Sequence, residues 1–253
     1  MTQKIVAIGG GKIGWGAMPS QVMPISQEIV RLSGKKKPKL VFIPTASSDD
    51  KSYARMVQGH FGGKLGCQVD VLYLHKLKPS LIEIRKRILS ADIVYVGGGN
   101  TLMMMNRWKK LGVDKVLKEA HGKGKVLCGT SAGAICWFRQ GNSDSRKYHN
   151  PKAGLIKVAG LGFIDALACP HYDAEKDRKP ELKKMMKKTA GVSIAMDNCA
   201  ALEILGDRYR SISSKSTAQA FQVYWHKGRY FQNPIPSGKN WQPLARLNVK
   251  ISR

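Results

Sequence analysis

One short segment, Cys128–Ile135, restricts the fold more than any other part of the chain. It places Ser131 between Gly129 and Gly133, in the pattern G-x-S-x-G. The apolar run before it predicts a strand, and the small apolar residues after it predict the start of a helix. Where a strand turns sharply into a helix, small neighbours are needed and the serine hydroxyl points outward. Taken alone, the segment fits a catalytic serine or an ordinary glycine-rich turn whose serine caps the helix.

Apolar runs and helical patterns alternate through the first half of the chain. Strands are expected at residues 4–8, 39–44, 68–74, 93–96 and 126–128, and helices at 26–32, 53–65, 81–89, 102–111 and 113–121. Continuous apolar strands between helices are typical of a parallel sheet covered on both faces. The chain therefore predicts an α/β fold, a flavodoxin-like three-layer arrangement with its ligand site beyond the carboxyl ends of the strands.

The second half has a different pattern. Residues 141–162 form a polar, glycine-rich excursion, and strands are expected at 166–169, 193–196, 200–205, 209–212 and 220–225. The runs 193–196 and 200–205 are expected to pair as a hairpin that turns through Asp197 and Asn198. This half predicts a C-terminal antiparallel extension at one edge of the sheet. Because no repeat or low-complexity linker interrupts the chain, residues 1–253 are interpreted as a single domain.

The chain is strongly basic, with 43 Lys and Arg against 17 Asp and Glu and a net charge of +26. Such a balance raises the hypothesis of a nucleic-acid partner. The basic runs at 35–37, 85–87 and 183–188 lack the interleaved aromatic residues of a stacking surface. A solvated basic surface is therefore favoured, and nucleic acid is not an expected partner.

The cysteines and the N-terminus favour a cytoplasmic protein. The 5 cysteines never occur in Cys-x-x-Cys spacing, which indicates reduced thiols and neither a disulfide frame nor a metal site. No apolar run reaches the roughly 18 residues of a membrane span. The first residues enter a strand without the pattern of a signal peptide.

A glycine-rich turn at Gly9–Gly14 matches the G-x-G-x-x-G pattern of dinucleotide-binding proteins. That fingerprint needs a helix to begin at once, and Pro19 and Pro24 disfavour one here. The second strand also ends in Thr45–Ser47, where an acidic residue would bind the ribose. No nicotinamide or other cofactor is expected.

A serine nucleophile needs a base and a group that orients the base. His171 follows an apolar strand and a proline, which puts it at a strand end, and His149 in the polar loop is the second candidate. For the orienting acid the chain offers Asp144, with Asp173 and Asp197 as open alternatives.

A second glycine-rich turn, Gly97–Thr101, follows the strand at 93–96 and opens a helix. It presents bare backbone amides and the short polar side chains of Asn100 and Thr101, which are candidates for binding substrate. One of its amides, together with that of Ala132, can hold a developing oxyanion.

With these motifs in place, the chain resembles the peptidase E family of serine peptidases, which includes the cyanophycinases. The fold of that family is related to class I glutamine amidotransferases. The blocks that match, over residues 1 to about 225, are Ile5–Gly11, Val41–Ser47, Val94–Thr101, Gly129–Ala134 and the pair Pro170–His171.

The resemblance implies a hydrolase of short peptides with Ser131 as nucleophile, His171 as base and Asp144 as orienting acid. The amides of Gly99 and Ala132 would form the oxyanion hole. Family members characterised as peptidase E cleave dipeptides with an N-terminal aspartate, so an acidic N-terminal residue is one expected specificity. Thr130 departs from the family, which often carries a bulkier aromatic residue there, and so does the loop at 140–151.

Two other functions stay open. One is a binding or regulatory protein that kept the fold and lost the chemistry, and the other is a nucleic-acid-binding protein. Whether the chain forms a homodimer also stays open.

Overall fold

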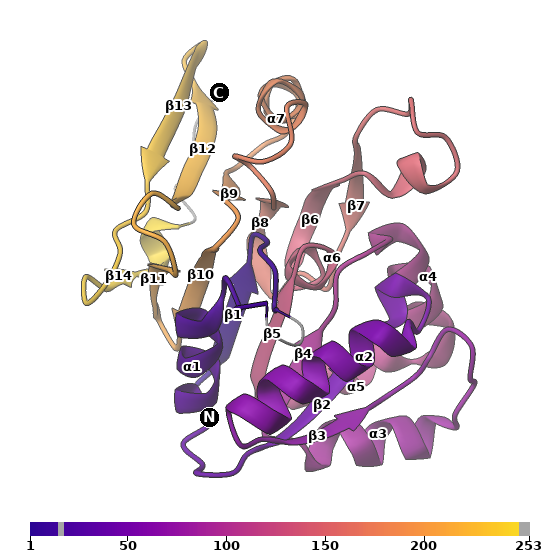
Figure 1. Cartoon of the computed structure of the whole chain (residues 1–253). Coiled ribbons are helices and arrows are strands. Elements are labelled where there is room, and N and C mark those ends of the chain that lie inside the picture. Colours follow the sequence, from indigo (N-terminus) through magenta and orange to yellow (C-terminus); the bar gives the residue numbers. More distant parts are fainter. Residues whose placement is uncertain (15–17, 248–253) are drawn as a thin grey trace.

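The chain forms two β-sheets, described over residues 1–14 and 18–247 in a computed structural model (Figure 1). The first sheet has the order β14-β11-β10-β1-β5-β4-β2-β3. Its strands are β1 (Lys4–Ile8), β2 (Lys39–Ile43), β3 (Gln68–Val71), β4 (Ile93–Val96), β5 (Val126–Thr130), β10 (Ala200–Leu205), β11 (Arg208–Ser213) and β14 (Gln242–Pro243). Strands β1, β5, β4, β2 and β3 are mutually parallel, whereas β10, β11 and β14 add antiparallel strands beside β1.

Helices cover both faces of this sheet, as the sequence predicts. They are α1 (Met23–Leu32), α2 (Lys51–Val57), α3 (Leu81–Ser90), α4 (Thr101–Leu111) and α5 (Val113–Gly122). The short helix α6 (Ala132–Ile135) contacts strands of both sheets, and α7 (Arg178–Lys187) packs against the other sheet. Along β1, Val6 and Ile8 pack with α1 and α2, while Ile5 and Ala7 share a core with α3, α4 and α5. Alternate side chains of one strand thus enter two different cores. Within residues 1–14 and 18–247, none of the helices is both long and apolar enough to cross a membrane.

A second sheet, which the sequence does not predict, is built from strands that all lie beyond Ser131. Its order is β13-β12-β9-β8-β6-β7. The strands are β6 (Phe138–Ser143), β7 (Ile156–Ala159), β8 (Ile164–Cys169), β9 (Ser193–Met196), β12 (Ala220–His226) and β13 (Arg229–Pro234). Figure 1 shows the hairpin β12–β13 next to α7. The polar excursion at residues 141–162 therefore contains the end of β6, a short 3-10 helix at Ser145–Tyr148 and the strand β7.

The hairpin expected at residues 193–205 is wrong. Strand β9 pairs with β8 and β12 in the second sheet, and β10 pairs with β1 and β11 in the first. Both strands are apolar and buried, and such a pattern identifies a buried strand without identifying its neighbour. Residues 197–199 therefore carry the chain from one sheet to the other, with Cys199 at a φ of 67°.

The first sheet buries a carboxyl group, that of Glu203 on β10, which has no exposed surface (0%). Its Oε2 accepts a hydrogen bond from Nε of Arg210 at 2.7 Å, and Arg210 also donates to Glu28. Among the described residues, Oε1 of Glu203 has no hydrogen-bond partner. Burial raises the pKa of Glu203 to about 7. On the same side of this sheet, burial lowers the pKa of His60, whose ring bonds to Ser26 of α1, to about 4.

These two groups should give stability opposite dependences on pH. Folded Glu203 holds its proton up to about pH 7, so its contribution to the free energy of unfolding falls as pH rises from its ordinary pKa toward 7. His60 stays neutral in the fold down to about pH 4, so its contribution rises with pH toward its ordinary pKa. For Glu203→Gln, the free energy of unfolding relative to the natural chain should rise by about 2 kcal/mol between pH 5 and pH 8.

Denaturant unfolding at the two pH values measures this difference. His60→Gln should give a difference of the opposite sign over the lower part of the range, because it removes the group that favours higher pH. A Glu203→Gln difference that does not change with pH would show that the carboxyl is ionised in the folded protein.

Candidate active site

Ser131 lies in a strained turn between β5 and α6. Its backbone has a φ of 55° and a ψ of −113°, a conformation that costs a residue other than glycine on the order of 1–3 kcal/mol. The turn is tight on both sides. A Cβ on Gly129 would lie 2.5 Å from the carbonyl oxygen of Gly133, and one on Gly133 would overlap the carbonyl oxygen of Val96. The two glycines of G-x-S-x-G are therefore required by close backbone packing.

The imidazole of His171 lies next to the Ser131 hydroxyl. Nε2 of His171 is 2.9 Å from Oγ of Ser131. His171 follows β8 and Pro170 and has a φ of 54°, so it too is held in a rarely adopted conformation. Its backbone N–H donates to the carbonyl oxygen of Gly9 at 3.0 Å. The structure thus brings the predicted nucleophile and the predicted base within hydrogen-bond distance.

Asn198, which the sequence analysis placed in a hairpin turn and not in the site, contacts the other side of the ring. Its Oδ1 is 2.8 Å from Nδ1 of His171. An amide oxygen can only accept, so Nδ1 carries the proton and Nε2 is left as an acceptor for the Ser131 hydroxyl. The backbone N–H of Asn198 in turn donates to Oδ1 of Asp173 at 2.7 Å. Ser131, His171 and Asn198 form a continuous hydrogen-bonded chain.

Asp144, the expected orienting acid, is not the partner of the ring. It follows β6, and its Oδ2 lies 4.0 Å from the buried guanidinium of Arg178 on α7. The expected role of Asp144 is therefore corrected. Strand β6 leads Asp144 toward α7, whereas the crossing from β9 to β10 brings Asn198 to Nδ1 of His171.

The two alternative acids are also engaged elsewhere. Asp173 holds the backbone of Asn198, and Asp197 accepts a hydrogen bond from the N–H of Gln219 at 3.0 Å. Burial raises the pKa of Asp197.

The glycine-rich turn after β1 packs directly against the segments that carry His171 and Asn198. The carbonyl oxygen of Gly10 accepts a hydrogen bond from the N–H of Cys199 at 2.9 Å. A Cβ on Gly10 would overlap Oδ1 of Asn198 and would lie 2.5 Å from Nδ1 of His171. The G-x-G-x-x-G match is thus explained by close packing. Helix α1 begins only at Met23, with Pro24 in its first turn, where proline is tolerated. Part of the intervening segment, residues 15–17, lies outside the described residues.

The turn at Gly97–Thr101 borders the nucleophile through Gly98. A Cβ built on Gly98 would be 3.3 Å from Cβ of Ser131 and 3.8 Å from its Oγ. The peptide that joins Gly98 to Gly99 therefore lies beside the hydroxyl. A Cβ on Gly99 would overlap the carbonyl oxygen of Ala46, so this turn also packs against the end of β2.

The side chains of Asn100 and Thr101 are used within the fold. Oδ1 of Asn100 accepts a hydrogen bond from the N–H of Met103 at 3.0 Å and caps α4. Thr101 is 1% exposed, and its hydroxyl accepts from that of Ser143 at 3.3 Å. Asn100 also borders a pocket of about 430 Å³ together with His149. The structure therefore places the second candidate base, His149, in this pocket, while the ring bonded to Ser131 is that of His171.

A different pocket, of about 380 Å³, lies at the end of β5. Thr130, the residue before Ser131, lines it together with Tyr53 and Tyr95. The hydroxyl of Tyr53 accepts a hydrogen bond from the N–H of Gly98 at 3.4 Å.

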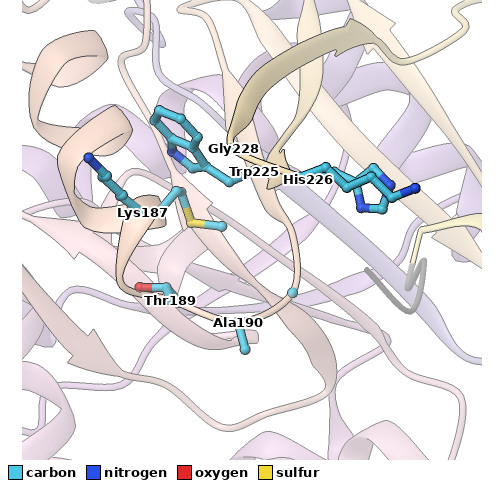
Figure 2. Close-up of a pocket in the computed structure, with 9 residues that line it drawn as sticks. Lys187, Thr189, Ala190, Trp225, His226 and Gly228 are labelled. Carbon is cyan, nitrogen blue, oxygen red and sulfur yellow. The ribbon is translucent and has the colours of Figure 1, made fainter. Parts of the chain in front are cut away.

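A third pocket, of about 410 Å³, shares no residue with this site. Figure 2 shows it between the end of α7 and the turn that joins β12 to β13, with Lys187 and Trp225 among its lining residues. The Nζ atoms of Lys183 and Lys187 lie 6.0 and 5.9 Å from the centre of the Trp225 ring. Basic and aromatic side chains that are separate in the sequence thus meet on this face.

The model of peptidase family S51 matches residues 5–212. The uncharacterized peptidase YgaJ of Bacillus subtilis is 36% identical over 237 residues, which cover 92% of this chain and 97% of YgaJ. The uncharacterized peptidase Lmo0363 of Listeria monocytogenes is 31% identical over 159 residues, 60% of this chain and 73% of that protein.

Solved structures share the fold. A peptidase from an acI-B1 actinobacterium has a TM-score of 0.71 and 18% identity, covering 96% of this chain and 97% of that one. A putative peptidase E protein from Listeria monocytogenes has a TM-score of 0.63 and 22% identity, covering 83% and 98%.

Gly10→Ala should disturb the hydrogen-bonded chain without reaching Ser131 directly. The added methyl group overlaps Asn198 and displaces the ring of His171. We expect labelling of Ser131 by a fluorophosphonate probe to slow by about ten-fold or more, because small displacements of a base have large effects on rate. Gly63→Ala is the control, since its Cβ would meet no atom within 4 Å. Equal labelling rates in the two variants, both folded by circular dichroism, would contradict the proposal that Gly10 positions His171 and Asn198 through close packing.

Proposed function

Because the chain belongs to peptidase family S51 and is therefore a peptidase, we propose that it hydrolyses short peptides through an acyl-enzyme on Ser131. The observation that carries the proposal is the 2.9 Å contact between Oγ of Ser131 and Nε2 of His171. A serine hydroxyl is a weak nucleophile and reacts when a neighbouring base removes its proton.

The proton in this mechanism moves between Ser131, His171 and the leaving group. Nε2 of His171 takes the hydroxyl proton as Oγ attacks the peptide carbonyl, and it later gives that proton to the departing amine. Asn198 keeps the proton of His171 on Nδ1 throughout, so that Nε2 is the atom that exchanges protons. Water, activated by the same ring, then releases the acyl group from Ser131.

The backbone amides of Gly99 and Ala132 are the proposed oxyanion donors. The amide of Ala132 directly follows the nucleophile and opens α6, so no carbonyl within its own helix can accept from it. The N–H of Ser131 itself donates to the carbonyl oxygen of Ile8 at 3.1 Å. That bond supports a hole built from the next residue and from the Gly98–Gly99 peptide.

The substrate class rests on family membership, and an acidic N-terminal residue is the specificity that the sequence resemblance implies. The alternative function is a binding protein without catalysis. It is favoured if the purified chain neither hydrolyses peptides nor reacts with a fluorophosphonate.

Ser131→Ala should abolish hydrolysis, with kcat lower by at least about 10³-fold, because no other hydroxyl occupies the position of the nucleophile. Ser131→Gly should be equally inactive but more stable than Ser131→Ala by about 1 kcal/mol, because glycine adopts a φ of 55° without strain. Peptide hydrolysis and denaturant unfolding of both variants measure these effects. Hydrolysis that persists in both would end the assignment of Ser131.

Asn198→Ala should lower kcat by about 10²-fold or more and leave KM nearly unchanged, because the ring loses the acceptor that fixes its tautomer. Asn198→Asp should retain more activity than Asn198→Ala, since a carboxylate still accepts from Nδ1. Asp144→Asn should change kcat by less than about three-fold. If Asp144→Asn is the more damaging change, the orienting group has been misassigned.

A further inference from the structure

The pocket beside Ser131 has a chemical character that bears on substrate choice. It has a volume of about 380 Å³ and is lined mainly by apolar atoms. We propose that it receives the side chain of the residue whose carbonyl is attacked, and that it selects large apolar or aromatic side chains over acidic ones. The inference rests on the proposed peptidase function and names its substrate class.

Three residues that line the pocket are neighbours of the candidate site. Thr130 lines the pocket and directly precedes Ser131. Tyr53 lines it too, and its hydroxyl accepts from the N–H of Gly98, the glycine that borders Ser131. Gly11 also lines it and follows Gly10, which packs on His171. An acyl group bound to Oγ would therefore have its side chain within reach of this pocket.

The walls of the pocket favour burial of apolar groups. Ile13, Met56 and Tyr95 supply much of the lining. The Tyr53 ring stacks edge-on against Phe42, with centroids 5.1 Å apart. The Tyr53 hydroxyl already accepts a hydrogen bond from the N–H of Gly98. A carboxylate placed among these groups would lose its water without gaining a full set of partners.

Among the described residues that line the pocket, Lys12 is the one charged residue, and its side chain is exposed to solvent. An exposed ammonium adds little to the binding of a carboxylate. The small side chain of Thr130 leaves the pocket open, where a bulkier residue before the nucleophile would occupy part of it.

Dipeptides that share one C-terminal residue and differ in the first, with Leu, Phe, Ala, Asp or Glu, test the proposal. We expect kcat/KM for the Leu and Phe substrates to exceed that for the Asp and Glu substrates by at least about ten-fold. If the acidic substrates are preferred and hydrolysis still needs Ser131, the pocket proposal fails while the proposed function stands. If no substrate is hydrolysed and Ser131 is not labelled by fluorophosphonate, both fail.

Met56→Arg tests the pocket directly by placing a cation on its wall. The Leu-to-Asp ratio of kcat/KM should fall by about ten-fold or more, with the Ala substrate changed by less than about three-fold. Met103→Arg is the matched control, because Met103 lines the separate pocket that contains Asn100 and His149. It should leave the ratio unchanged.

Met56→Trp provides a second, uncharged variant. It should reduce hydrolysis of the Phe substrate by about ten-fold while the Ala substrate is hydrolysed nearly as before, because the added ring fills the pocket. Equal effects on the Phe and Ala substrates in both Met56 variants would place the substrate side chain elsewhere.

Discussion

The arrangement of the candidate site depends on the close approach of the Gly9–Gly11 turn to the two segments that carry His171 and Asn198. The carbonyl oxygen of Gly9 accepts the N–H of His171, and that of Gly10 accepts the N–H of Cys199. No side chain fits between these backbones, because a Cβ at Gly9 or Gly10 would overlap its neighbours. A turn without side chains therefore positions the ring of His171 and the amide of Asn198. The placement of both side chains depends on backbone packing.

The site combines a strained backbone with an uncharged group behind the imidazole ring. Ser131 and His171 each adopt a positive φ, at a cost of about 1–3 kcal/mol per residue, and the buried ends of β5 and β8 hold them there. An uncharged acceptor behind the ring avoids the desolvation of another carboxylate beside Asp197, whose pKa burial already raises. Asn198 can thus orient the imidazole without adding a buried charge.

Much of the first sheet could be predicted from sequence because its strands are short apolar runs that end in small residues. Ser131 and His171 stood out for the same reason, since a glycine-flanked serine and a histidine after a proline both mark strand ends. Asn198 could not be found in this way. An Asp-Asn pair between two apolar runs is also typical of a hairpin turn. Only the pairing of β9 and β10 with different sheets reveals that these residues cross between them. Asp144 was chosen for its acidic type, and the path of β6 takes it to Arg178.

The two side chains of the proposed serine–histidine pair come from different sheets, Ser131 from the end of β5 and His171 from the end of β8. The proposed activity therefore requires the two sheets to be docked, in addition to each being folded. Proteins open in cooperative units smaller than the whole. A transient separation of the layers would disconnect the hydroxyl from its base while most backbone hydrogen bonds stay intact, so that reactivity at Ser131 reports on sheet docking sooner than secondary structure does.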